Sequence, residues 1–377
     1  MESKVRSFVR KGEVTKTGGA GGGYVQAVGA KPGCHGVSLV SSGLDDLDHI
    51  LPLRNPLSLI VGGGIPVGGL VMVMEDIEAP HHMPLLRFFM AQGLVHSQPL
   101  FFATPLPSPQ AFLGTLPAIA SRSSGAASDN SKEGDLRIAW QYRRFLNEQQ
   151  ALEERRYRYE FCNDFDLRKP AERSLFTGAT IKCESLARGA HLDSLLDHCR
   201  VFISNLARYT GEGQLVGRLA FQSLCAPQCM QSCTDWEMLR FLQSLKSLLR
   251  VSNAVALITF PATLLTPSMA IRWQHLADIL ISVEAVLDDN KEMAGMLTDY
   301  PDILGFLRIH KLASINTQVP TIPEAAMHAM KVVRRKKLVL ERLLFAPVDA
   351  TSGDSKTGGA AGLLCGRPAN ASSPLDF

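Results

Sequence analysis

The chain has 377 residues, 46% of them hydrophobic and 20% charged, and its 39 Lys and Arg residues nearly balance 36 Asp and Glu residues. These values exclude a histone-like polycation, an acidic tail protein and a wholly disordered chain. Eight cysteines are too few for a disulfide scaffold, and the polar start MESKVRSFVRKGEV carries no secretory signal, so we expect reduced thiols in the cytoplasm and nucleus. No run of about 18 apolar residues occurs, so we predict neither a membrane span nor a membrane partner.

Low-complexity segments delimit the predicted folded body. Residues 1–35 include the run GGAGGG, and we predict a flexible tail there. The segment SRSSGAASDNSKEGD at 121–135 is predicted as a disordered insert, and the Gly-, Ala- and Ser-rich residues 351–377 as a second flexible tail. We predict that the residues between the two tails, 36–350, form one domain. Within it, residues 141–190 mix Arg, Tyr and acidic residues without a helix or strand period, which predicts an irregular excursion from the sheet.

Short apolar runs and helical patterns alternate through this body. In chain order we predict a strand at 70–75, a helix at 83–95, a strand at 99–104, a helix at 191–208, a strand at 215–224, a helix at 234–253, a strand at 254–260, a helix at 269–277, and strands at 278–284, 305–312 and 338–345. The alternation predicts an α/β fold with a mainly parallel sheet flanked by helices. The last strands follow one another without a helical pattern between them, so we expect an antiparallel edge.

The predicted helix at 234–253 has a clear start signal. Thr234 is followed three residues later by Glu237, which is the spacing of a capping box. Apolar residues then recur with a helical period. We therefore place Trp236, Leu239, Phe241 and Leu242 on the core side of this helix.

The most informative segment surrounds the first predicted strand. The run SGLDDLDHIL at 42–51, followed by GGGIPVGG at 62–69 and an apolar strand, resembles the entry to the RecA/KaiC-like ATPase core. In that family the strand leads into a Walker A loop, GxxxxGK[ST], in which backbone N–H groups and the Lys hold phosphates and the hydroxyl holds Mg²⁺. Here the strand is followed by EDIEAPHHMP, which has no Lys, Ser, Thr or Gly.

This degenerate phosphate-loop region instead carries negative charge and two imidazoles. Glu75, Asp76 and Glu78 are unfavourable neighbours for phosphate, and we expect His81 and His82 to be exposed loop residues rather than catalytic or metal-binding ones. The later strand ends in Gln222 and Ser223, where an acidic partner for Mg²⁺ would be expected. We predict a RecA-like shape that lacks a Walker A phosphate loop, with no catalytic residue and no cofactor.

A second resemblance rests on the order of several segments. They are LVSSGLDDLDHIL, GGGIPVGG, VMVMEDIEAPHHMPLLRFFMAQGLV, LRIAWQY, SNAVALITFPATLL, LADILISVEAV, GFLRIHKL, KKLVLERLLFAPVD and the terminal LDF. In this order they resemble the PAXNEB family of fourth Elongator subunits, of which the chain looks like a plant-like or other divergent member. The run PLRNPLSLIV at 52–61 departs from the family pattern and is either an extra loop or a gene-model artefact.

The resemblance implies a function that composition and spacing do not supply. It implies a non-catalytic RecA-like subunit that assembles with two related subunits, the fifth and sixth, into a hetero-hexameric ring. That ring would belong to Elongator and bind tRNA, while a radical-SAM and acetyl-CoA-using subunit modifies the wobble uridine at its 5-position. Two alternatives stay open: a nucleotide-hydrolysing RecA/KaiC-like ATPase, and a transcription-elongation or chromatin scaffold.

The densest basic run is KVVRRKK at 331–337. Arg334, Arg335, Lys336 and Lys337 are candidates for contacts with RNA phosphates, with a nuclear signal or a solvated approach to the last strand as alternatives. The Arg and Tyr residues of 142–159 could stack bases or dock on a neighbouring subunit.

Three cysteines follow the strand at 215–224 at equal intervals: Cys225, Cys229 and Cys233. A structural zinc site needs a fourth ligand, and no further Cys or His lies close by in the sequence. We therefore favour small apolar thiols in a loop over a metal site, and predict no metal.

Overall fold

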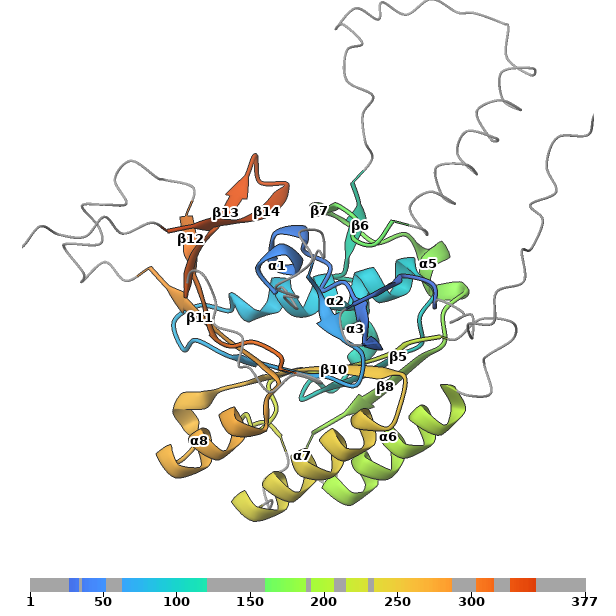
Figure 1. Ribbon diagram of the computed structural model, residues 1–377, viewed down its shortest axis with the longest axis vertical. Helices are drawn as coiled ribbons and strands as arrows, with labels where there is room; N and C mark the ends of the chain where they lie inside the picture. The colour runs from blue at the N-terminus through green and yellow to red at the C-terminus, as the bar shows by residue number, and fades with distance from the viewer. Residues whose placement is uncertain are drawn as a thin grey trace, which may run out of the picture. The chain divides into compact units, whose positions relative to one another are not determined.

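The structure of the chain is a computed structural model (Figure 1). It describes residues 27–33, 36–51, 63–120, 160–187, 191–206, 215–229, 234–286, 303–314 and 326–343. Several predicted features lie outside these residues: the run at 52–61, the insert at 121–135, LRIAWQY, the Arg and Tyr residues of 142–159, Cys233 and the tail at 351–377.

The main element is a mixed β-sheet. Its strands are β4 (Leu70–Met74), β5 (Leu100–Thr104), β8 (Ile181–Ser185), β9 (Gly217–Phe221), β10 (Ala254–Phe260), β11 (Ile279–Ala285), β12 (Ile303–Lys311), β13 (Met327–Val333) and β14 (Lys337–Arg342). Within the described residues their order is β14-β13-β12-β11-β4-β10-β9-β5-β8. The strands from β11 to β8 are parallel, whereas β12, β13 and β14 each pair antiparallel with the strand before. The predicted mainly parallel sheet with an antiparallel edge is confirmed.

Helices cover both faces of the sheet (Figure 1). One face carries α6 (Leu192–Leu206), α7 (Asp235–Arg250) and α8 (Pro267–Leu276), and the other carries α1 (Asp45–Ile50), α2 (His82–Val95) and α3 (Pro109–Leu113). The short helices α5 (Arg173–Thr177) and η2 (Ala262–Leu264) complete the described set. None of the helices in this described part has the length and apolar character needed to cross a bilayer. The predicted α/β fold is therefore confirmed.

The central strand β4 shows why the core has two halves. Val71 and Val73 pack in the cluster that contains α2, whereas Leu70 and Met72 pack in the cluster that contains α7. Successive side chains of a strand point to opposite faces, so a strand covered on both sides must be apolar throughout. This is why LVMVM is an unbroken apolar run.

Two small sheets flank the main one. β1 (Ala30–Pro32), β2 (Ser38–Val40) and β3 (Ile65–Pro66) form one, and β6 (Pro117–Ile119) pairs with β7 (Phe165–Pro170) in the other. The predicted tail at 1–35 is therefore too long, because β1 pairs antiparallel with β2. A three-residue strand leaves no periodic signal in the sequence.

The predicted excursion at 141–190 is also too long. Its described part contains β7, α5 and β8, and β8 pairs parallel with β5 in the main sheet. The prediction failed because β8 is an edge strand of the sequence IKCES, half-buried at every position, in which Lys182 and Glu184 interrupt the apolar pattern. β13 was missed for a similar reason, since His328 and Lys331 break its apolar run.

The helix start at Thr234 is confirmed, but one core assignment is wrong. The Thr234 hydroxyl accepts a hydrogen bond from Glu237 N–H, and the Glu237 carboxylate accepts one from Thr234 N–H, which is the reciprocal capping box. Leu239, Phe241 and Leu242 are buried as predicted. Trp236 is 63% exposed, because it lies in the first turn, where the Arg272 guanidinium rather than the core covers its ring.

Candidate functional site

The loop at 75–81 joins the end of β4 to the start of α2, where the sequence predicts the degenerate phosphate loop. Glu75 N–H donates to Phe260 O at 2.9 Å, so pairing with β10 continues one residue beyond β4. The Asp76 carboxylate accepts a hydrogen bond from Ala285 N–H at 2.6 Å, which ties the loop to the end of β11. The Asp76 side chain lies in the position of a phosphate-binding loop, and it binds the protein's own backbone instead.

Glu75 and His82 form a buried pair beside this loop. Their side chains are 9% and 8% exposed, and Glu75 Oε1 lies 3.7 Å from His82 Nε2. Burial lowers the pKa of His82, although the charge of Glu75 acts in the opposite direction. The prediction that His82 is an exposed loop residue is wrong, because the first turn of α2 turns it inward against Glu75.

His81 and Ile77 differ in their surroundings. A Cβ added to Gly305 would lie 2.7 Å from His81 Cδ2, so His81 packs directly on the backbone of β12. Burial also lowers the pKa of His81. Ile77 is 69% exposed and Glu78 is exposed beside it. The loop thus offers carboxylates, neutral imidazoles and an apolar tip, which is a poor set of groups for binding phosphate.

The end of β9 offers no acidic group to hold Mg²⁺. The Gln222 side chain accepts a hydrogen bond from Thr104 Oγ1 at 2.8 Å, and Ser223 N–H donates to Thr259 Oγ1 at 2.8 Å. Cys229 is buried and Cys225 half-buried. In the part of the chain that the structure describes, His, Cys, Asp and Glu side chains form no group of three or more that could hold a metal.

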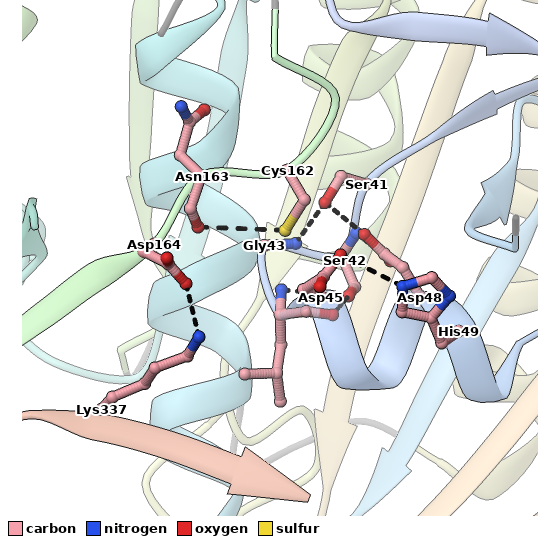
Figure 2. A network of polar contacts seen from close by, with 11 residues as sticks. Ser41, Ser42, Gly43, Asp45, Asp48, His49, Cys162, Asn163, Asp164 and Lys337 are labelled. Atoms are coloured by element: carbon pink, nitrogen blue, oxygen red, sulfur yellow. Dashed lines mark hydrogen bonds and ion pairs between the residues drawn. The ribbon is translucent and has the colours of Figure 1, made fainter. Parts of the chain in front are cut away.

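The four candidate RNA-binding residues lie at one hairpin but have two different environments. Arg334 and Arg335 occupy the turn between β13 and β14, each with a φ of 53°, and both are exposed. Lys337 Nζ lies 2.7 Å from Asp164 Oδ1, and Figure 2 draws this ion pair as a dashed line. Lys336 Nζ lies 3.9 Å from Asp166 Oδ2.

These contacts join the hairpin to the segment before and within β7. Leu167 N–H donates to Lys336 O at 2.9 Å, and the hydrogen bond to Asp164 raises the pKa of Lys337. The charges of both lysines are therefore partly neutralised by the chain itself, whereas the arginines at the tip are available to an external anion.

A buried polar network lies beneath α1, and it was not predicted. Asp48 is fully buried and accepts hydrogen bonds from Ser41 Oγ and from Ser42 N–H, the latter at 2.7 Å (Figure 2). Burial raises the pKa of Asp48 to about 6. The carbonyl of Ser41 in turn accepts a hydrogen bond from Arg218 Nη1 at 2.9 Å.

Arg218 is the buried cation of this network. It is fully buried in β9, its Nε donates to Gln98 Oε1 at 2.6 Å, and its Nη1 also donates to Phe89 O at 2.9 Å. Burial lowers its pKa to about 10. Network residues thus come from β9, from α2 and the residues after it, and from α1 and the segment before it, so their buried hydrogen bonds fix how these parts of the chain pack. An Arg within the apolar run LVGRLAF was the available sequence signal.

Comparisons with known proteins give the family. A family model described as PAXNEB protein matches residues 24–376. The relative named "Elongator complex protein 4" from Dictyostelium discoideum is 26% identical, with 84% of this chain and 77% of the relative covered. The relative of the same name from Xenopus laevis is 27% identical, with 93% and 92% covered.

The human protein of that name is 26% identical, and 100% of this chain and 95% of that protein are covered. Among solved structures, a KaiC-like protein from Pyrococcus horikoshii aligns with a TM-score of 0.42 and 11% identity, over 81% of this chain and 99% of that one. Because the family model spans most of its length, the chain belongs to the PAXNEB family.

Proposed function

We propose that this chain is the fourth subunit of an Elongator complex and that it acts there without catalysing a reaction itself. Family membership and the shared name of its relatives support the first part. The loop at 75–81 carries the second part, because its sequence lacks the Lys and hydroxyl of a phosphate-binding loop and its Asp76 binds the backbone of β11.

In this proposal the subunit works by assembly. It joins the two related RecA-like subunits, the fifth and sixth, in a hetero-hexameric ring that associates with the core Elongator subunits in the cytoplasm and nucleus. The radical-SAM and acetyl-CoA-using subunit modifies the wobble uridine of tRNA at its 5-position, and the ring contributes tRNA binding. The exposed turn of Arg334 and Arg335 supports a contact with tRNA phosphates on this subunit.

The direct test of this function is complementation. A cell that lacks its own fourth Elongator subunit is supplied with this chain, and mass spectrometry measures the fraction of wobble uridines modified at the 5-position. We expect modification to be restored, and to be restored equally by Glu75→Gln, because no chemistry is assigned to that loop. An expressed chain that restores no modification, or a Glu75→Gln variant that accumulates normally yet is inactive, would contradict the proposal.

A further inference from the structure

The two edges of the main sheet are protected to different degrees. At one edge, Leu340 N–H of β14 donates to Asp46 Oδ2 at 2.9 Å, and charged residues occupy both ends of the strand. Charged side chains and side-chain caps of this kind prevent a further strand from pairing at a sheet edge. β8 forms the opposite edge.

The hydrogen bonds of β8 show which of its backbone groups are free. Leu100 N–H donates to Thr180 O at 2.9 Å, and Leu186 N–H donates to Thr104 O at 2.7 Å. The backbone N–H and C=O groups of the even-numbered residues of β8 therefore point toward β5. Those of Ile181, Cys183 and Ser185 point away from the sheet. Among the described residues, no backbone–backbone hydrogen bond reaches these outward groups.

The sequence of β8, IKCES, is complementary to itself. If two copies pair antiparallel about a two-fold axis at Cys183, Ile181 of each copy lies opposite Ser185 of the other. The same register places Lys182 opposite Glu184 twice, once on each side of the axis. Cross-strand pairs of opposite charge stabilise a sheet, and an interface of this type uses the same patch on both copies.

The side chains of β8 leave room for a further strand at this edge, on both faces of the sheet. Ile181 and Cys183 are partly buried on the face that carries α2. Glu184 faces α6, where His198 Nδ1 lies 3.0 Å from its carboxylate, and the Glu184 side chain is 34% exposed. A second copy would therefore extend both faces without burying an unpaired charge.

We propose that β8 is the docking edge for a second copy of this chain, so that the isolated protein forms a dimer with a continuous sheet. Because this register places Lys182 opposite Glu184, reversing the charge of one or both residues is the sharpest test. Sedimentation equilibrium of the full chain should show a dimer, and Lys182→Glu or Glu184→Lys alone should weaken it roughly tenfold by placing like charges opposite each other. The double variant should return the dissociation constant to near the wild-type value, and Lys169→Glu, at an exposed lysine outside β8, should leave it unchanged.

Two further variants test the backbone pairing itself. Cys183→Pro removes an outward N–H and no bond to β5, so it should abolish the dimer and leave the thermal unfolding temperature close to the wild-type value. The two Cys183 residues would be a hydrogen-bonded pair with Cα atoms about 5.5 Å apart, so mild oxidation should link two chains through Cys183. Cys183→Ser should prevent the link and keep the dimer.

Three results would overturn the inference. They are a chain that stays monomeric at the highest concentration reached, a dimer that neither the charge variants nor Cys183→Pro affects, and association of β8 only with a different protein. Because these measurements use this chain alone, they are independent of whether it joins the ring.

Discussion

Two buried charges, Asp48 and Arg218, constrain the packing beneath α1. Ser41 connects them, since its hydroxyl donates to Asp48 and its carbonyl accepts from Arg218. Neither charge touches the other directly, and each is held by neutral hydrogen-bond partners. Removing one member of such a network leaves the others buried and unsatisfied, which costs about 1–3 kcal/mol per group.

Asp48 should make folding stability depend on pH in an unusual direction. The unfolded chain releases this proton near pH 4 and the folded chain near pH 6, so the folded state binds more protons between these values. Stability from this group is therefore fully present below about pH 4 and falls by roughly 3 kcal/mol as the pH rises through 6.

Urea unfolding of the wild type and Asp48→Asn across this range measures the effect. The free energy of unfolding of the wild type relative to Asp48→Asn should fall as the pH rises from about 4 to about 7. Asp45→Asn, at an exposed position of the same helix, should give a profile parallel to the wild type. Parallel profiles for Asp48→Asn as well would show that Asp48 is not buried as an ionisable group.

The basic hairpin should divide into two functional pairs. Arg334→Ala with Arg335→Ala should weaken tRNA binding by the assembled ring and reduce the salt slope by about 1 to 2, since these side chains are exposed. Lys336→Ala with Lys337→Ala should change binding less, because Asp164 partly neutralises Lys337 at 2.7 Å and Asp166 lies 3.9 Å from Lys336. Equal losses from the two double variants, or a larger loss from the lysine pair, would refute this division.

At the scale of elements, α2 is held against the sheet by a close contact. A Cβ added to Gly93 would lie 2.5 Å from Arg218 Cδ, so only glycine lets the buried guanidinium pass beneath the helix. Alanine in an exposed helix interior is usually about 1 kcal/mol more stable than glycine. Here that preference should be reversed by overpacking.

We expect Gly93→Ala to lower the free energy of unfolding by about 1–3 kcal/mol in chemical denaturation. Gly114→Ala is the matched control, because this C-cap of α3 has a φ of −64° and its nearest neighbour would lie 3.4 Å away. The control should be neutral or slightly stabilising. A Gly93→Ala protein as stable as the control would mean that α2 can move away from Arg218.

The elements that the sequence predicts best are those buried on both faces. β4, β5 and β10 are apolar at nearly every position because helices cover both sides of each, and α7 has both a capping box and a strong apolar stripe. β8 was not predicted because it is a half-buried edge strand without a clear apolar alternation. β13 was not predicted because His328 and Lys331 interrupt its apolar run. The sequence shows directly which residue types the loop at 75–81 contains, whereas the burial of His82 and the ion pairs of Lys336 and Lys337 depend on how the chain folds.

At the scale of the whole molecule, the near-neutral net charge is the sum of acidic and basic regions that lie at different places. The loop at 75–81 is acidic and folded onto β11, while the β13–β14 turn presents two exposed arginines. Beside that turn, Lys337 pairs with Asp164, and Lys336 lies 3.9 Å from Asp166. This distribution suits a subunit that contributes one part of a shared RNA surface better than one with a private nucleotide site.

The central claim is that this chain acts as an assembly subunit rather than as an enzyme. Native mass spectrometry of the chain co-expressed with the two related subunits tests it most directly. The account predicts one dominant species with the mass of a hetero-hexamer containing all three subunits, formed without added nucleotide. Recovery of this chain only as a monomer or homodimer, while the other two subunits assemble without it, would contradict the account.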